Sequence, residues 1–101
     1  MVINNINFNT DKIAFFCKKH GIKQLALFGS VLSKKFTSAS DIDVMVTFSP
    51  QYHCSYFDLL DIKAELEQMT GREIDLVEKD SITNPYRKKS IFQNMEVIYD
   101  S

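Results

Sequence analysis

Three acidic residues and one glycine–serine pair are the parts of this sequence whose types and spacing could do chemistry. Asp41 and Asp43 begin one apolar segment, and Asp75 lies inside a second apolar segment further along the chain. Carboxylate oxygens are the ligands that Mg²⁺ prefers, so the three acids are candidates for a cation site. Gly29 and Ser30 end an earlier apolar segment, and a glycine lets a phosphate approach the backbone closely. Together these residues predict chemistry on a phosphate with the help of a cation.

A sheet is needed to bring the three acids together. Residues 41–48 are predicted to form a strand, in which successive side chains point to opposite faces. Asp41 and Asp43 then share one face, and the other face is apolar, with Ile42, Val44, Val46 and Phe48. A parallel neighbouring strand at residues 73–77 would place Asp75 beside the pair. Three carboxylates about 5 Å apart repel by roughly 3 kcal/mol per pair at an effective dielectric near 20, and a bound cation removes this repulsion. The alternative is that the acids are separated and solvated on an open face.

The remaining pattern predicts helices alternating with strands. Helices are expected at residues 10–20, 55–70 and 84–93, a short helical turn at residues 31–36, and strands at residues 22–28, 41–48, 73–77 and 96–99. The long helix before the third strand suits a parallel crossover, and the short connection between the first two strands suits an antiparallel pair. The predicted fold is α/β (α+β), a single domain over residues 1–101 with a mixed central sheet of about four strands and helices packed on one face.

Composition excludes several classes of protein. The chain has 101 residues, and 12 Lys and Arg nearly balance 13 Asp and Glu, which argues against broad nucleic-acid binding. No segment approaches the roughly 18 apolar residues of a membrane span. Cys17 and Cys54 lack the spacing of a metal site, so we expect two free thiols in a reducing cytoplasm.

The motifs at residues 27–30, 40–46 and 73–77 resemble those of the polymerase-β-type nucleotidyltransferases, in particular their minimal, single-domain members. The resemblance implies one or two Mg²⁺ ions held by Asp41, Asp43 and Asp75. It implies ATP as substrate, bound at Gly29, Ser30, Asp41 and Asp43. The implied reaction is in-line attack by an acceptor hydroxyl on the α-phosphate with release of pyrophosphate. Asp75 is the implied general base, so the catalytic set is Asp41, Asp43 and Asp75.

Many minimal members look like antitoxins that are paired with a HEPN-type ribonuclease toxin in prokaryotes. The resemblance therefore implies a cytoplasmic antitoxin of a type VII-like pair, which transfers AMP from ATP to a tyrosine of the toxin. We expect hetero-oligomers with that toxin and no membrane partner. The chain length leaves no room for an acceptor-binding domain, which fits an acceptor that is another protein.

One segment departs from the family pattern. Family members commonly follow Gly-Ser with an Arg-Ala-Arg-Gly-like run, whereas residues 31–36 here read VLSKKF. An arginine fork binds phosphate through two hydrogen bonds, and lysine is not equivalent. Either Lys34 or Lys35 takes over the charge, or triphosphate binding is weaker, or the chain is a non-catalytic antitoxin that neutralises its partner by binding. A small-molecule nucleotidyltransferase of the antibiotic-modifying kind is a further alternative. The basic residues 87–89 are expected on a solvated helix face, with a partner or nucleotide contact as the alternative.

Overall fold

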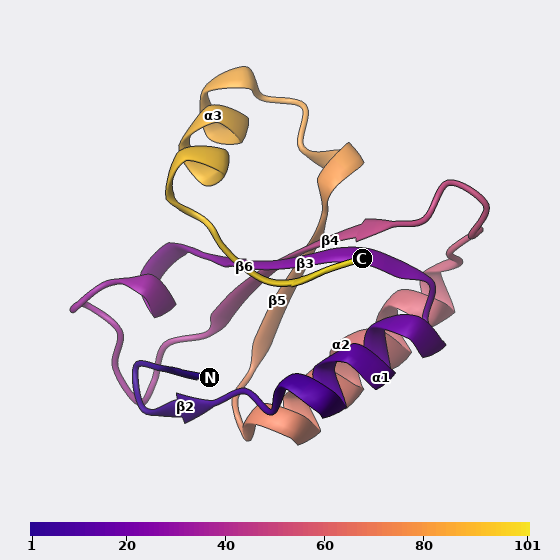
Figure 1. The fold of residues 1–101 in the computed structure, drawn as a ribbon. Helices are drawn as coiled ribbons and strands as arrows, with labels where there is room; N and C mark the ends of the chain where they lie inside the picture. The colour runs from indigo at the N-terminus through magenta and orange to yellow at the C-terminus, as the bar shows by residue number, and fades with distance from the viewer.

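A four-stranded mixed sheet forms the centre of the protein, as seen in a computed structural model of residues 1–101 (Figure 1). The strands lie in the order β5 (Ile74–Glu78), β4 (Ile42–Phe48), β3 (Ile22–Phe28) and β6 (Glu96–Asp100). β4 runs parallel to β5 and antiparallel to β3, which also pairs antiparallel with β6. The predicted mixed sheet and fold class are confirmed.

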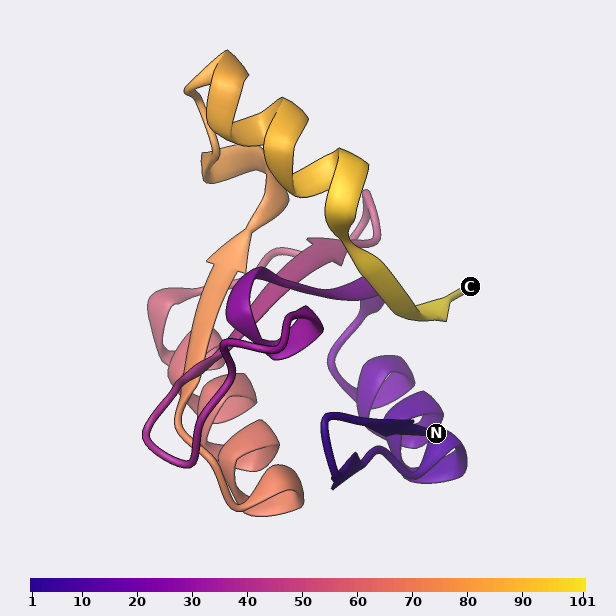
Figure 2. The ribbon, with the colours of Figure 1, turned by 90° about the vertical axis from the view of Figure 1, so that its left-hand side faces the viewer.

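Three α-helices cover the two faces of this sheet unequally. α1 (Thr10–Lys19) and α2 (Tyr56–Thr70) lie side by side under one face, and α3 (Pro85–Asn94) stands on the other (Figures 1 and 2). The expectation that the helices pack on one face is therefore right for α1 and α2 and wrong for α3. None of the helices combines the length and the apolar character that a membrane crossing requires.

The alternation of side chains along the strands explains why both faces are covered. The main core contains Ile42, Val44 and Val46 under the α1–α2 face, as the strand pattern predicts. A second, smaller apolar cluster lies on the opposite face; it consists of Ala26, Phe28, Met45, Ile82 and Ile91. Ile91 belongs to α3, so burying this second cluster is what holds α3 on its side of the sheet.

The short elements differ from the prediction in part. The short helical turn expected at residues 31–36 is a 3₁₀ helix, η1 (Gly29–Leu32), which begins and ends earlier and starts at the glycine itself. A second 3₁₀ turn, η2 (Lys79–Ser81), follows β5. The N-terminal segment forms an unpredicted hairpin of β1 (Val2–Ile3) and β2 (Ile6–Asn7). Its turn residues Asn4 and Asn5 have φ of 50° and 66°, a conformation that asparagine tolerates in tight hairpins.

The ends of α2 follow the sequence closely. The Ser55 hydroxyl accepts a hydrogen bond from the backbone N–H of Asp58, whose carboxylate accepts one from the Ser55 N–H. This reciprocal pair is a capping box. At the other end Gly71 adopts φ of 68°, the left-handed conformation that stops a helix. These local signals fix the length of the crossover between β4 and β5.

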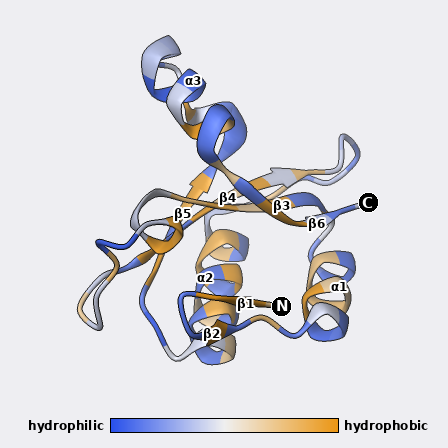
Figure 3. Ribbon diagram, turned by 60° about the vertical axis from the view of Figure 1, so that its left-hand side comes forward, coloured by the Kyte–Doolittle hydropathy of each residue, from blue (hydrophilic) through white to orange (hydrophobic).

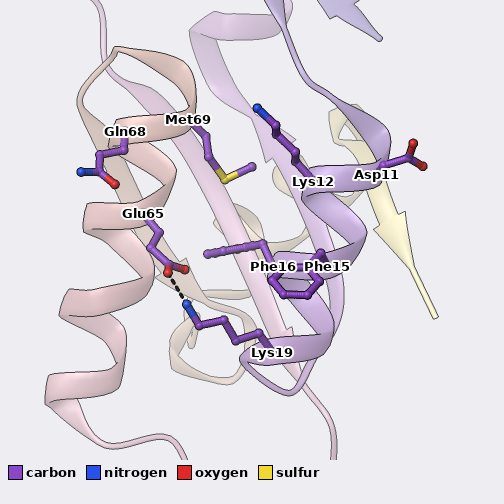
Figure 4. A pocket seen from close by; sticks show the side chains of 8 residues that line it. All are labelled: Asp11, Lys12, Phe15, Phe16, Lys19, Glu65, Gln68 and Met69. Atoms are coloured by element: carbon purple, nitrogen blue, oxygen red, sulfur yellow. Dashed lines mark hydrogen bonds and ion pairs between the residues drawn. The ribbon is translucent and has the colours of Figure 1, made fainter.

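An ion pair links α1 to α2 on the side of the molecule away from α3. Glu65 of α2 accepts a hydrogen bond from Lys19 Nζ at 2.6 Å, and His20 Nε2 lies 2.5 Å from its other oxygen. Figure 4 shows Lys19 reaching Glu65 across a cleft of about 400 Å³ between the two helices. The hydrogen bond from Lys19, with His20 as the second partner, holds the pKa of Glu65 below its usual value.

We expect Glu65→Gln to lower stability at pH 7, and to lower it less at pH 3. A carboxyl group whose pKa is lower in the folded state stabilises the protein above its unfolded pKa, about 4.3, and this contribution is lost as pH falls through the folded pKa. Because the pair is partly exposed, the loss at pH 7 should not exceed about 1 kcal/mol. Urea denaturation at both pH values measures it. Asp61→Asn, on the same helix without an ion pair, should change stability little at either pH.

Candidate functional site

The strand pairing brings two of the predicted acids together. Asp43 on β4 and Asp75 on β5 are partners in the parallel register, so their side chains stand side by side on the α3 face of the sheet. Asp43 is half-buried and Asp75 is exposed. The two carboxyl groups are close enough that a proton on one can hydrogen-bond to the other. The register therefore builds a carboxylate pair from residues 32 positions apart in the sequence.

The surroundings of Asp43 disfavour its negative charge. Burial raises its pKa most, followed by the charge of Asp75, the hydrogen bond with Asp75 and the charge of Asp41. Only Arg87 of α3 acts in the opposite direction. A half-buried carboxylate beside another carboxylate is stabilised by a proton or by a cation. The donor set at this point of the sheet therefore suits a hard divalent cation.

Asp41 lies less close to the pair than the sequence suggests. It precedes β4, is exposed, and has a smaller effect on Asp43 than Asp75 has. No three His, Cys, Asp or Glu side chains are arranged in this structure as a metal-binding group. The structure thus joins Asp43 to Asp75 and leaves Asp41 within electrostatic range of them.

Gly29 leaves the space that the Asp43 carboxylate occupies. It follows β3 directly, next to Phe28, which pairs with Asp43 across the sheet. Its φ is 76°, and a Cβ at this position would collide with Asp43 Oδ2. Ser30 follows in η1, and its carbonyl accepts hydrogen bonds from the Ser33 N–H at 2.9 Å and the Ser33 hydroxyl at 3.1 Å. The glycine–serine turn is therefore held against the carboxylate pair.

The two lysines that follow this turn do not approach the acids. Lys34 and Lys35 are exposed, and neither contributes to the electrostatic environment of Asp43. Lys34 instead lines a separate hollow beside Asn4 and Glu96. The one basic group whose charge acts on Asp43 is Arg87 of α3. The sequence did not distinguish it from Lys88 or Lys89, although its spacing of four residues from the buried Ile91 was a usable signal.

The cysteines lie outside this site. Cys17 and Cys54 are both free, as expected. Cys17 is buried under the opposite face of the sheet, and burial raises the pKa of its thiol to about 12. A thiol with so high a pKa is almost never ionised at neutral pH and is a poor nucleophile.

Comparisons with known proteins agree with this geometry. A family model described as a nucleotidyltransferase domain matches residues 11–98. "Putative protein adenylyltransferase MJ1379" of Methanocaldococcus jannaschii is 42% identical over 77 residues, which cover 76% of this chain and 77% of that protein.

Solved structures show the same fold at low sequence identity. A toxin–antitoxin crystal structure with AMP-PNP matches with a TM-score of 0.72 at 18% identity, over 93% of this chain and 75% of that one. The structure of a tri-AMPylated HEPN toxin of Shewanella oneidensis in complex with MNT antitoxin also contains a matching chain. The match has a TM-score of 0.63 at 17% identity and covers 91% of this chain and 70% of that one. With the family match over nearly the whole sheet and its helices, the chain belongs to the nucleotidyltransferase-domain family and is a nucleotidyltransferase.

Proposed function

We propose that this chain is a Mg²⁺-dependent protein adenylyltransferase that transfers AMP from ATP to a tyrosine hydroxyl of a HEPN-type ribonuclease toxin. It would act as the antitoxin of a type VII-like pair in the prokaryotic cytoplasm. The observation that carries the proposal is the Asp43–Asp75 pair beside Gly29. The names of its relatives, which include protein adenylyltransferases, and the fold shared with an MNT antitoxin support it.

The residues present fit a divalent cation. Asp43 and Asp75 form an oxygen donor pair whose mutual repulsion a cation would relieve, and Gly29 keeps the space around Asp43 free of a side chain. Asp41 would complete the set from the same side of the sheet. When bound, Mg²⁺ supplies charge neutralisation for the phosphates and polarises the attacking hydroxyl.

The protein would supply position and a proton acceptor. The acceptor oxygen forms a bond to the α-phosphorus of ATP, the bond from that phosphorus to the bridging oxygen breaks, and pyrophosphate leaves. Asp75 is the exposed member of the pair, so its carboxylate is the one that an incoming protein hydroxyl can reach. It would take the proton of that hydroxyl. Gly29 and Ser30 would hold the phosphates with the reacting atoms in line.

A non-catalytic antitoxin is the second candidate function. It is favoured by the absence of arginine from residues 31–36 and by the position of Lys34 and Lys35 away from the acids. Such a protein would neutralise its partner by complex formation alone. It predicts protection that survives the loss of Asp43 and Asp75.

Labelled ATP tests the proposed function. The chain is incubated with Mg²⁺, the purified toxin encoded beside it, and ATP labelled either on the α- or on the γ-phosphorus. Adenylyl transfer predicts label on the toxin from α-labelled ATP only, because the γ-phosphorus leaves with pyrophosphate. Label from neither, together with intact complex formation, would favour the binding antitoxin. Label on hydroxyl-bearing small molecules without toxin would favour a small-molecule transferase.

A further inference from the structure

One face of α3 points at the site. Arg87, Ser90, Ile91 and Asn94 are spaced by three or four residues, so they lie along one side of the helix. Ile91 fixes the direction of this side, because it is buried in the cluster with Phe28 on the sheet. Figure 3 shows α3 mostly in hydrophilic colours. The side of α3 that faces the sheet is therefore partly polar.

A cavity of about 420 Å³ separates this face of α3 from the glycine–serine turn. Its walls are Gly29, Leu32 and Ser33 from the turn and Ser90, Ile91 and Asn94 from the helix, with Phe28 between them. Its volume lies in the range of small-molecule sites, roughly 300–1,000 Å³. Gly29, which lines the cavity, also borders the Asp43 carboxylate, because a Cβ at residue 29 would meet Asp43 Oδ2.

Arg87 lies one helical turn before Ile91, which lines the cavity, and its charge acts on Asp43. It is exposed, and its guanidinium makes no hydrogen bond or ion pair within the chain, so it can turn toward a ligand; its backbone N–H donates to Asn84 Oδ1. It is the single basic residue whose charge reaches Asp43. Its neighbour Lys88 lies over the ring of Phe92 instead.

We propose that Arg87 is a phosphate-binding residue: from α3 it binds the triphosphate of ATP in this cavity, and so supplies the arginine that residues 31–36 lack. This inference rests on the proposed function, because it assigns a residue to the ATP site of that reaction. A guanidinium is suited to the role because its planar fork forms two parallel hydrogen bonds to a phosphate group.

The test compares Arg87→Ala with Lys89→Ala. Both changes remove one positive charge from the same exposed helix, but residue 89 is two positions on and therefore points away from the sheet. Binding of ATP and of inorganic tripolyphosphate is measured by calorimetry in EDTA, which makes the readout independent of Mg²⁺ and of catalysis. Thermal unfolding of each variant confirms that it is folded.

We expect Arg87→Ala to weaken binding of both ligands about tenfold or more, and Lys89→Ala by less than about twofold. Arg87→Lys should restore part of the affinity, since lysine keeps the charge without the fork. If the two alanine variants weakened binding equally, or if neither did, the role of Arg87 would be overturned. The proposed function would still stand in that case, provided that the wild-type chain transfers label to the toxin. A wild-type chain that binds neither ligand and transfers no label would overturn both.

Discussion

Asp43→Asn is expected to abolish nucleotidyl transfer and at the same time to stabilise the metal-free protein. Transfer should fall at least about a thousandfold, because the amide cannot carry the charge that a cation at this site requires. Stability should rise because the pKa of Asp43 is raised in the folded protein, whereas that of Glu65 is lowered. The ionised Asp43 carboxylate therefore destabilises the fold at pH 7, and the neutral amide does not. A group whose pKa is higher in the folded state stabilises the protein below its unfolded pKa, and this contribution is lost as pH rises through the folded pKa.

Two measurements on the same variant check this expectation. Label transfer to the toxin gives the activity, and urea denaturation in EDTA at pH 7 gives the free energy of unfolding. Asp100→Asn, the same chemical change at an exposed end of β6, should leave both quantities close to wild type. Transfer by Asp43→Asn at a wild-type rate would place the reaction elsewhere. Lower stability in EDTA would mean that the ionised carboxylate is favourably solvated, against the electrostatics described above.

Gly29→Ala is expected to lose activity far beyond its loss of stability. The left-handed backbone at φ of 76° costs a side-chain-bearing residue about 1–2 kcal/mol. In addition, the new methyl group would collide with Asp43 Oδ2 and displace the carboxylate. A displacement of about 1 Å in a reacting group can cost about a hundredfold in rate, so we expect a loss of at least that size.

Gly71→Ala is the matched control for this variant. Gly71 has nearly the same φ, 68°, but nothing lies within 4 Å of the position its Cβ would take. Both variants should therefore lose similar stability in urea denaturation, and only Gly29→Ala should lose transfer activity. If the two variants kept equal activity, the contact between Gly29 and Asp43 would have no part in catalysis.

The carboxylate pair was predictable because two local patterns specify it. Alternation along residues 41–48 fixed the face of Asp43, and the apolar residues Ile74 and Leu76 fixed the face of Asp75. The long α2 between them, bounded by Ser55 and Gly71, suits a parallel crossover between neighbouring strands. Face and direction together were enough to bring the acids side by side.

The position of α3 was not predictable in the same way. Its apolar content is low, so periodicity alone does not say which face of the sheet it covers. The side that α3 covers is set by the burial of Ala26, Phe28 and Met45 on the second face of the sheet. This burial depends on long-range packing with Ile91 of α3. Because α3 carries Arg87, the same uncertainty hid the basic residue at the site.

The most direct test of catalysis asks whether the toxin stays inactive after this chain has been removed from it. The toxin is incubated with one-tenth of its molar amount of the chain in the presence of ATP and Mg²⁺, then separated from it and assayed for ribonuclease activity. If the Asp43–Asp75 pair catalyses transfer, the separated toxin stays silent, and the same treatment with Asp43→Asn leaves it active. A toxin that regains activity on separation, and that is silenced only by equimolar chain whether or not ATP is present, would contradict catalysis.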